Sequence, residues 1–513
     1  MKMIFLMLFI NTAGYSIAHA KNNLQFVRDQ MLEFLIHEQF QDENLNDTYA
    51  PIYFKGEWPN YMQNLDRMLL LGPQGKTALD SNLFVSSSIL VAITKIALTN
   101  PDYFHERFPE IDKVIEHGLE SFQRYQDNLK PRKKNQVTSS PLVYTFWPLL
   151  PRSQHLPSNN GKVIMVRRPT NYVLKSDFIN NAANVPADAD DTAMGYLARH
   201  LAHLWNSSLF SRPENNFSEI FDLYRDKNRR SLHYYNAVHG FKLFTGAYLT
   251  WFDREPFFTP ISWLPIHKGK SYIPYGANEV DCVVNSNILY SASVTGQLND
   301  LKGQDDACDF INDATKHVRR IQMCGLYYPT AFHFPYAYAR AISSGVTCLG
   351  KHKNRVIDYV MASQKDDGSF TAHPRGQRWK GALLGGINSF EKNEKRSKDI
   401  EEKEKKQIVE LNEAEISEQE SIQSTVYALG TLINLDSKLT EASVKMAFQK
   451  GIEFVISKVK QNHRKQMYIE GGTFFAGGTL VRGSLSWKSP SYTTAIFAQI
   501  LTEYLKIDQL QNN

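Results

Sequence analysis

The strongest constraint on the fold is an alternation of two kinds of helical segment along the chain. One kind is apolar around nearly its whole circumference, which predicts a helix buried on every side, whereas the other has one apolar face, typical of an outer helix. The inner candidates are residues 83–93, 192–204, 283–294, 331–342, 424–435 and 493–505, and the outer candidates include residues 24–35, 111–125, 356–364 and 444–459. Six inner helices and about six outer ones predict an all-α chain folded as an (α/α)6 toroid.

Three other stretches qualify this helical prediction. Strand-like residues at 162–166 and 469–475 predict short hairpins at most. Residues 391–420 alternate Lys and Glu with few apolar residues, which predicts a solvated, charged insertion without a chemical role. The remainder of residues 21–513 is interpreted as a single domain.

Residues 1–20 have the pattern of a signal peptide. Lys2 gives the charged start, residues 4–10 form the apolar core, and Ala18-His19-Ala20 is a small-residue cleavage site. The mature chain is expected to begin at Lys21 and to be secreted or periplasmic. No later apolar run approaches the length of a bilayer-spanning helix, so the sequence predicts no integral membrane span.

Four cysteines fit an exported chain. They are Cys282, Cys308, Cys324 and Cys348. In an oxidising compartment they predict two disulfides, for which three pairings are open. Buried free thiols are the alternative, and the spacing lacks the close pairs of a zinc site.

Charge and motifs narrow the class of partner. The net charge of +5 is spread along the chain, without the basic and aromatic strip that tracks a nucleic-acid backbone, so no nucleic acid is expected. A Gly-rich phosphate loop, HExxH and GxSxG are absent from the sequence, and no cofactor or metal is predicted. The expected partner is a small molecule, either apolar or a glycan.

The most informative polar stretch is an acid cluster at the start of an inner segment. Asp188, Asp190 and Asp191 directly precede an apolar run at three- and four-residue steps. One Asp is explained as a helix cap, because its side chain accepts hydrogen bonds from unpaired backbone N–H groups. Three carboxyl groups together raise one another's pKa, which keeps a proton available for acid catalysis.

The segment Asp188-Ala-Asp190-Asp191-Thr-Ala-Met resembles the DxDD(T)A motif of class II terpene cyclases, the family of squalene–hopene cyclases and copalyl diphosphate synthases. In that family the middle carboxylic acid protonates an alkene, and its neighbours hold it in the reactive orientation. The resemblance implies that Asp190 is the catalytic acid and that Asp188 and Asp191 support it.

A second segment is similar to the QW motif of the same superfamily, in which a Gln caps an outer helix and an aromatic ring packs over it. It runs Tyr359-Val-Met-Ala-Ser-Gln364-Lys-Asp-Asp-Gly368-Ser-Phe370. A degraded copy lies within residues 450–474, and residues 486–495 resemble the terminal inner helix of such proteins. These likenesses support the predicted fold more than a function.

A toroid of this kind gathers the N-termini of its inner helices at one rim, where a site is expected. Beside the acid cluster, the polar residues near this rim are expected to bind substrate. They are Asp281, Asn285, Tyr328 and His333, together with the basic residue Arg168 just upstream of the cluster. Ordinary helix caps explain the same polar positions, and His333 also fits a buried structural histidine.

Three functional hypotheses stay open at this point, and whether the chain is an enzyme is one of the questions. The first is an acid-initiated cyclase or isomerase of an isoprenoid-like substrate, with Asp190 as acid and an aromatic cup that stabilises the carbocation. The second is an exported glycan hydrolase or lyase that pairs Asp190 with Asp281 or Asp80 from across the cup. The third is a non-catalytic toroid that binds a small molecule or a protein.

Overall fold

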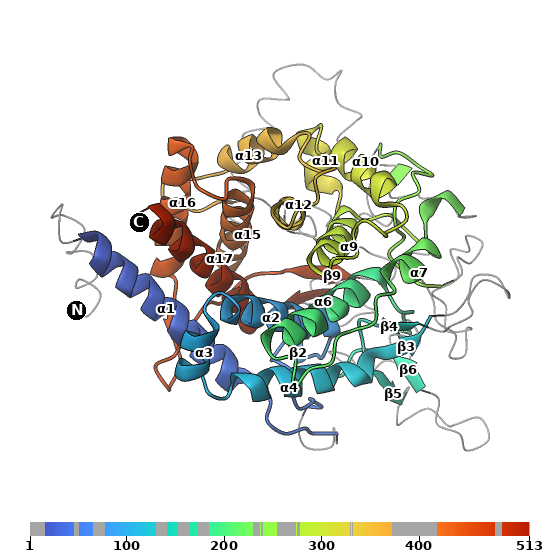
Figure 1. Cartoon of the computed structure of the whole chain (residues 1–513), viewed down its shortest axis with the longest axis horizontal. Coiled ribbons are helices and arrows are strands. Elements are labelled where there is room, and N and C mark those ends of the chain that lie inside the picture. The colour runs from blue at the N-terminus through green and yellow to red at the C-terminus, as the bar shows by residue number, and fades with distance from the viewer. Residues whose placement is uncertain are drawn as a thin grey trace.

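The chain is mostly helical and carries small antiparallel sheets, which confirms the predicted helical character and adds strands to it. The computed structural model describes residues 16–45, 51–64, 77–129, 141–151, 165–171, 184–228, 236–237, 240–253, 273, 278–328, 330, 332–371, 418–477 and 485–511. Figure 1 shows an inner group of these helices surrounded by an outer group.

The inner helices contact one another in a closed order. Each inner helix packs against the next inner helix along the chain, and the last of them, α17, packs against the first, α2. Their bounds are α2 Leu83–Ala97, α6 Ala189–Trp205, α9 Cys282–Val294, α12 His333–Ser343, α15 Glu418–Leu435 and α17 Pro490–Gln511. Every inner segment expected from the sequence is therefore helical. Helix α15 includes residues 418–420, the end of the expected insertion, and the rest of that insertion lies outside the described residues.

Burial explains why these segments lack a polar face. Every residue of α2 except Lys95 is buried. The helix begins where Asn82 accepts a hydrogen bond from the Val85 N–H at 3.0 Å. Asp188 caps α6 and Asp281 caps α9 in the same way. Polar caps therefore set the start of these helices, and apolar composition sets their place in the core.

The outer helices bury one face only. On α13 the buried residues are Val356, Tyr359 and Val360, while the other side faces solvent. The outer helices and short helical turns are α1 Ser16–Glu38, α3 Pro101–Arg107, α4 Ile111–Ser121, η1 Phe122–Tyr125, α7 Phe217–Asp222, η3 Asp226–Asn228, α10 Gln304–Ala314, α11 Val318–Met323, α13 Lys353–Met361 and α16 Ala442–Ser457. All the outer segments expected from the sequence coincide with members of this set.

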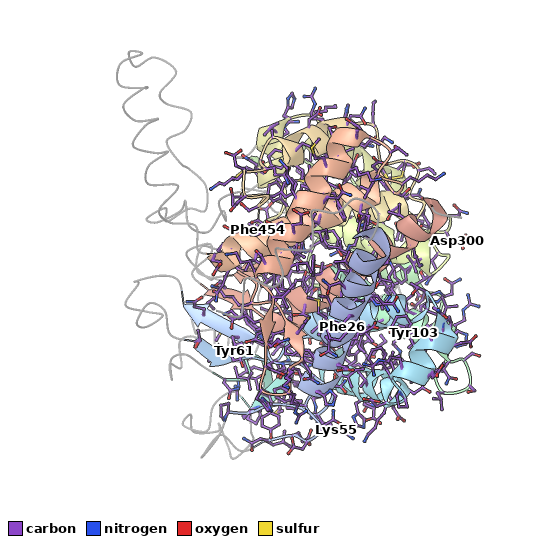
Figure 2. All side chains as sticks on the ribbon, turned by 90° about the vertical axis from the view of Figure 1, so that its left-hand side faces the viewer. Phe26, Lys55, Tyr61, Tyr103, Asp300 and Phe454 are labelled. Atoms are coloured by element: carbon purple, nitrogen blue, oxygen red, sulfur yellow. A yellow bond between two sulfur atoms is a disulfide. The ribbon has the colours of Figure 1, made fainter. Side chains whose placement is uncertain are left out.

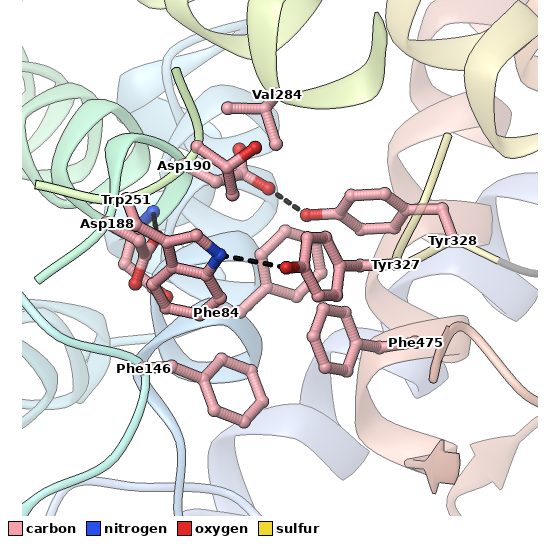
Figure 3. Close-up of a pocket in the computed structure, with 11 residues that line it drawn as sticks. Phe84, Phe146, Asp188, Asp190, Trp251, Val284, Tyr327, Tyr328 and Phe475 are labelled. Atoms are coloured by element: carbon pink, nitrogen blue, oxygen red, sulfur yellow. Dashed lines mark hydrogen bonds between the residues drawn. The ribbon is translucent and has the colours of Figure 1, made fainter. Parts of the chain in front are cut away.

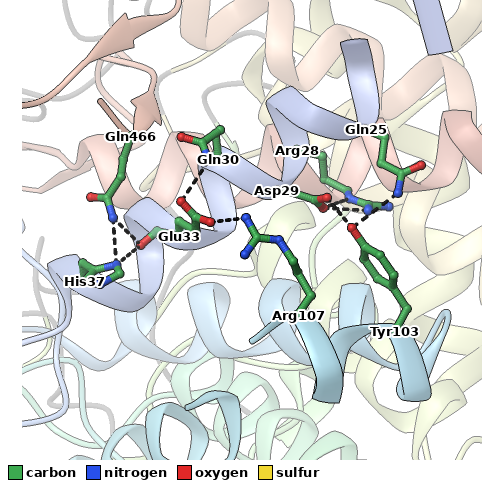
Figure 4. Close-up of polar contacts among 9 residues, drawn as sticks. All are labelled: Gln25, Arg28, Asp29, Gln30, Glu33, His37, Tyr103, Arg107 and Gln466. Atoms are coloured by element: carbon green, nitrogen blue, oxygen red, sulfur yellow. Dashed lines mark hydrogen bonds and ion pairs between the residues drawn. The ribbon is translucent and has the colours of Figure 1, made fainter. Parts of the chain in front are cut away.

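Helix α1 lies on the outside, against α17 and the strand β8. Figure 2 looks onto this side, where Phe26 is 53% exposed. Polar contacts fasten α1 to α3, since Asp29 accepts from the Tyr103 hydroxyl and Glu33 forms an ion pair with Arg107 (Figure 4). These contacts lie beyond residue 20, so a chain that begins at the expected cleavage position keeps them.

The largest sheet joins distant parts of the chain. Its antiparallel order is β2-β1-β10-β9, and Met62 of β1 is paired with Trp487 of β10. Shorter pairs are β3 with β4, β5 with β6 and β7 with β8. The strand bounds are β1 Tyr61–Asn64, β2 Thr77–Leu79, β3 Gln126–Asn128, β4 Leu142–Tyr144, β5 Leu149–Pro151, β6 Met165–Arg167, β7 Lys460–Gln461, β8 Met467–Tyr468, β9 Phe475–Gly477 and β10 Leu485–Lys488. The four-stranded sheet exceeds the short hairpins that the sequence predicted, because its partners are not neighbours along the chain.

The QW-like segment fastens α13 to α16. Gln364 Nε2 donates to the Ala447 carbonyl of α16 at 2.7 Å and to the Gly368 carbonyl at 3.2 Å. Phe370 is fully buried beside Gly451, where an added Cβ would come within 3.0 Å of the ring. The Gln and the aromatic ring thus secure one contact between outer elements.

Two disulfides decide among the pairings left open by the sequence. They join Cys282 to Cys324 and Cys308 to Cys348. In the described part of the chain, no single helix has both the length and the apolar composition to cross a membrane. Helices α2 and α3 meet the criteria of length and apolar composition only when they are taken together, and the chain bends by 110° between them.

Candidate functional site

A small cavity lies where the first turns of α2, α6 and α9 meet (Figure 3). Its volume is about 20 Å³. Aromatic rings form much of its wall, and the acid cluster forms one side of it. The lining residues are Phe84, Phe146, Asp188, Asp190, Asp191, Thr250, Trp251, Val284, Tyr327, Tyr328 and Phe475. The rim at which the sequence analysis placed a site therefore holds a small, largely apolar cavity.

The start of α6 delivers all three aspartates to this space. Asp188 is the N-cap, and its Oδ1 accepts from the Asp191 N–H at 2.9 Å. Backbone bridges on either side, to Tyr144 and to Trp251, hold Asp188 in extended conformation. Capping thus accounts for Asp188, while Asp190 and Asp191 occupy the first helical turn without that role.

Asp190 is held by donors from two other elements. It is 4% exposed. Asn287 Nδ2 of α9 donates to Oδ1 at 2.8 Å, and the Tyr328 hydroxyl donates to Oδ2 (Figure 3). Burial raises the pKa of Asp190 to about 6, because the charged form loses its hydration, and the two hydrogen bonds oppose the rise. About a tenth of Asp190 therefore carries a proton at pH 7, and most of it does at pH 5.

The two flanking carboxyl groups retain protons more strongly. Burial raises the pKa of Asp188 to about 7, and burial together with the charge of Asp188 raises the pKa of Asp191 well above its usual range. No cation is among the main causes of either shift. The cluster therefore holds at least one proton at neutral pH, because three neighbouring buried carboxylates repel one another.

The opposite wall is a set of packed aromatic rings. Phe475 of β9 stacks on Phe146 with ring centres 4.8 Å apart, and its ring centre lies 5.6 Å from that of Tyr328. Trp251 Nε1 donates to the Tyr327 hydroxyl at 2.8 Å. The face of an aromatic ring attracts a cation. None of the lining residues is Lys or Arg, so the wall suits a substrate part that becomes positive rather than one that starts negative.

Asp281 and Asn285 lie close to the cavity but bind backbone. Asp281 Oδ1 accepts from the N–H of Val283 at 2.7 Å, and Oδ2 accepts from the N–H of Leu326 and, at 3.4 Å, of Tyr327. Asn285 pairs with the Tyr248 N–H at 2.9 Å and with its carbonyl at 3.0 Å. Both side chains therefore position the loops that carry the aromatic wall.

His333 and Arg168 also lie outside the lining. The His333 ring lies 4.4 Å from the ring of Tyr328, centre to centre, and its Nδ1 is 3.2 Å from the Phe474 carbonyl. Arg168 donates to the carbonyls of Pro151 at 2.7 Å and Pro169 at 2.8 Å. Of the predicted substrate-binding residues, Tyr328 is the one that lines this cavity.

Sequence reasoning missed two polar residues behind Asp190. Asn287 is its amide donor, and Arg340 of α12 donates to Asn287 Oδ1 at 2.7 Å. Both lie in segments predicted to be buried inner helices, where an amide or a guanidinium needs a polar partner. Their presence there could have indicated a site. Trp251 lies outside every segment that was given a prediction, and Phe475 ends the stretch 469–475, which was predicted only as a short hairpin, so neither was recognised as a site residue.

In the part of the chain that the structure describes, no group of three His, Cys, Asp or Glu side chains is arranged to hold a metal ion. The acid cluster itself supplies three carboxyl groups with raised pKa values, and one of them, Asp188, also caps a helix. Its arrangement suits the storage and transfer of a proton.

No protein-family model and no curated protein sequence matches the chain. Solved structures do. The apo form of type II terpene cyclase MstE from Scytonema aligns over 95% of this chain and 99% of its own, at 11% identity and a TM-score of 0.44. A variant of MstE in complex with geranylgeranyl dihydroxybenzoate, its substrate, aligns over 96% and 100% at 10% identity, again with a TM-score of 0.44.

Two other similar structures belong to different enzymes. The ent-copalyl diphosphate synthase from Streptomyces platensis aligns over 82% of this chain and 50% of its own, at 10% identity and a TM-score of 0.35. The GH family 9 endoglucanase J30 aligns over 94% and 84%, at 9% identity and a TM-score of 0.39. Likeness at this level spans enzymes of unrelated chemistry, so the function has to be argued from the residues of this chain.

Proposed function

We propose that this chain is an (α/α)6 toroid that acts as a general-acid cyclase or isomerase, with Asp190 protonating a carbon–carbon double bond of an isoprenoid-like substrate. The closed order of inner-helix contacts supports the toroid. The acid cluster and the aromatic wall support the chemistry.

The observation that carries the proposal is the placement of Asp190. A carboxylic acid can protonate an alkene only in its neutral form and shielded from water; burial shields Asp190 and raises its pKa to about 6, which increases the share of the neutral form. The resulting carbocation needs electron-rich surroundings without a nucleophile, which ring faces such as those of Phe146 and Phe475 provide.

In the proposed first step, the proton passes from Asp190 to the substrate, and no other reagent takes part. The O–H bond of Asp190 breaks, a C–H bond forms at the alkene, and the positive charge moves to the neighbouring carbon. Asn287 and Tyr328 then donate to the carboxylate that is left, and hydrogen bonds to a charged group are stronger than those to a neutral one. Attack by a further double bond closes a ring, and the proton that the cation then loses from carbon returns, directly or through water, to the Asp190 carboxylate, so the acid is restored and the substrate is isomerised without a co-reactant.

The size of the cavity sets a condition on this proposal. A cavity of about 20 Å³ has room for about one water molecule, whereas pockets for small molecules typically measure about 300–1,000 Å³. Substrate binding therefore requires wall side chains to move. Phe475 and Trp251 are the expected movers, because both are carried by strand or loop segments rather than by inner helices.

The described geometry gives less support to a glycan hydrolase. Such an enzyme needs a second carboxylate across the site. Asp80, one expected partner, accepts from the indole N–H groups of Trp147 at 3.1 Å and Trp487 at 2.7 Å. Asp281, the other, is engaged by backbone N–H groups. The carboxyl groups that line the cavity all come from the start of α6.

The test is product detection by chromatography coupled to mass spectrometry, which separates isomers of equal mass, after incubation with a panel of linear isoprenoid alcohols, acids and diphosphates. The wild type is compared with Asp190→Asn and with Asp313→Asn, which alters a buried carboxylate on α10. We expect a cyclised or isomerised product, of the same mass as its substrate, from the wild type and from Asp313→Asn only. A product from Asp190→Asn would remove the acid from the proposal, and no product from any of the proteins would favour a binding role.

We also propose that the chain is exported. Disulfides are typical of oxidising compartments, and both bridges lie in the region that holds Asp281 and Tyr328. N-terminal sequencing of the protein recovered outside the cytoplasm should begin at Lys21. A protein that stays inside the cell with Met1 in place would contradict this.

A further inference from the structure

Arg340 lies behind the proposed acid, separated from it by one amide group. We propose that Arg340 is a positioning residue that acts through Asn287 on Asp190, fixing which oxygen carries the acid proton and offsetting the charge left after proton transfer. The inference rests on the proposed function, in which Asp190 is the acid. Its test reads the protonation of Asp190 directly and needs no turnover.

The three residues form a continuous buried chain across three helices. Arg340 of α12 is 5% exposed, and one of its terminal nitrogens donates to Asn287 Oδ1 at 2.7 Å. Asn287 Nδ2 of α9 donates in turn to Asp190 Oδ1 of α6 at 2.8 Å. The guanidinium also lies over the rings of Tyr290 and Tyr336, 4.9 and 4.5 Å from their centres. These contacts hold the cation in one place without neutralising it.

Arg340 determines how the Asn287 amide is oriented. A guanidinium has donors and no acceptor, so the carbonyl oxygen of Asn287 has to face it. The NH2 group then faces Asp190, whose Oδ1 has to accept. When Asp190 is neutral, its C=O oxygen is the better acceptor, so the proton is placed on Oδ2. That oxygen lies beside the hydroxyl of Tyr328, a residue of the cavity wall.

Arg340 also supplies the positive charge that the cavity wall lacks. The ionisable groups that act on Asp190 come from several elements, namely Asp188 at the N-cap of α6, Asp191 on α6, Asp281 at the N-cap of α9, Tyr328 before α12, Arg340 on α12 and Tyr492 on α17. Arg340 is the cation of this set, and all the others become negative when they ionise. In a buried site its charge acts on Asp190 with little screening by water.

Lys95 offers a matched control. It lies on α2, donates to the Tyr290 hydroxyl at 3.0 Å and sits 5.3 Å from the centre of that ring. It therefore shares a stacking partner with Arg340. Its hydrogen bond ends at Tyr290, whereas that of Arg340 continues through Asn287 to Asp190.

The experiment titrates Asp190 by difference infrared spectroscopy of its protonated carboxyl band. Each protein is compared with the same protein carrying Asp190→Asn, so that the difference isolates one carboxyl group. We expect the titration midpoint to rise by about one pH unit, a tenfold change, in both Arg340→Gln and Asn287→Leu, because the charged form of Asp190 loses a donor or a cation. Lys95→Met should leave the midpoint where it is in the wild type.

Each outcome decides the matter. An unchanged midpoint in folded Arg340→Gln overturns the inference, and so does an equal rise in Lys95→Met. If Arg340→Gln does not fold, Asn287→Leu decides by the same criterion. A raised midpoint in a protein that converts no isoprenoid supports the positioning role and counts against the proposed function. Product formation with an unmoved midpoint does the reverse.

Discussion

Replacing Asp190 with Asn should stabilise the folded protein at high pH while abolishing turnover. Asn has the shape of Asp and keeps both contacts, because its Oδ1 accepts from Asn287 and its Nδ2 donates to the Tyr328 hydroxyl. The substitution removes only the charge, whose burial is the unfavourable part of the native arrangement.

The magnitude follows from the pKa of Asp190. Burial raises this pKa from 3.8 to about 6, so the folded state binds the proton more tightly than the unfolded chain does. The associated stability is fully present below pH 3.8 and is lost as the pH rises to about 6. A shift of roughly two pKa units corresponds to about 3 kcal/mol. The Asp190→Asn variant should therefore be about 3 kcal/mol more stable than the wild type at pH 8, about half that at pH 5, and nearly equal to it at pH 3.5.

Urea unfolding of both proteins at these three pH values measures the difference. Asp313→Asn is the control, because Asp313 pairs with Lys316 at 3.1 Å and with Arg320 at 2.6 Å. Its loss leaves two cations unpaired and should destabilise the protein at pH 8, the opposite sign. If Asp190→Asn is less stable than the wild type at pH 8, or if the difference does not shrink on acidification, the reasoning about the buried carboxyl group is wrong.

Three further predictions concern the acid, its partner and the outer layer. The value of kcat/KM, which reports ionisation in the free enzyme, should rise as the pH falls from 8 and level off below about 6, the pKa of Asp190; a value that falls on acidification would exclude Asp190 as the acid. Tyr328→Phe removes a donor to the charged form of Asp190 and should move this pH profile upward by about one unit, with a lower limiting rate; an unmoved profile would contradict the contact. Gln364→Ala should lower the free energy of unfolding by about 1–2 kcal/mol, since two hydrogen bonds are lost, while activity per folded molecule stays constant in the same preparation; loss of activity without loss of stability would contradict the structural role.

The helical elements could be predicted because their signal is local. An inner helix such as α2 is apolar on all sides, and an outer helix such as α13 is apolar on one face, so periodicity within each segment suffices. The four-stranded sheet could not be found in this way. Its strands β1 and β10 are short and pair across nearly the whole chain, and no local pattern states which distant segment is the partner.

The residues of the candidate site likewise include some that a local sequence pattern reveals and others that only the packing of distant segments reveals. The acid cluster was visible because three carboxyl groups stand together, and the structure places all of them on one cavity. The side chains that act on Asp190 come from α9 and from the residues around α12, so their role depends on packing. Asn287 is one of several polar residues of α9, and Arg340 is a buried cation in the otherwise mostly apolar and aromatic α12. Only their alignment across three helices gives them a common target.

The disulfide between Cys282 and Cys324 has a consequence for when the site is assembled. It joins the first residue of α9 to the loop that leads to Tyr328, and the Cys282 N–H also donates to the Cys324 carbonyl at 2.8 Å. The two side chains that donate hydrogen bonds to Asp190, Asn287 on α9 and Tyr328 after Cys324, therefore belong to segments that this disulfide joins. A newly made chain with reduced thiols has the acid but lacks this covalent link between the segments that carry its two hydrogen-bond donors. We expect such a chain to be latent, with maturation of its proton donor timed by oxidation rather than by synthesis.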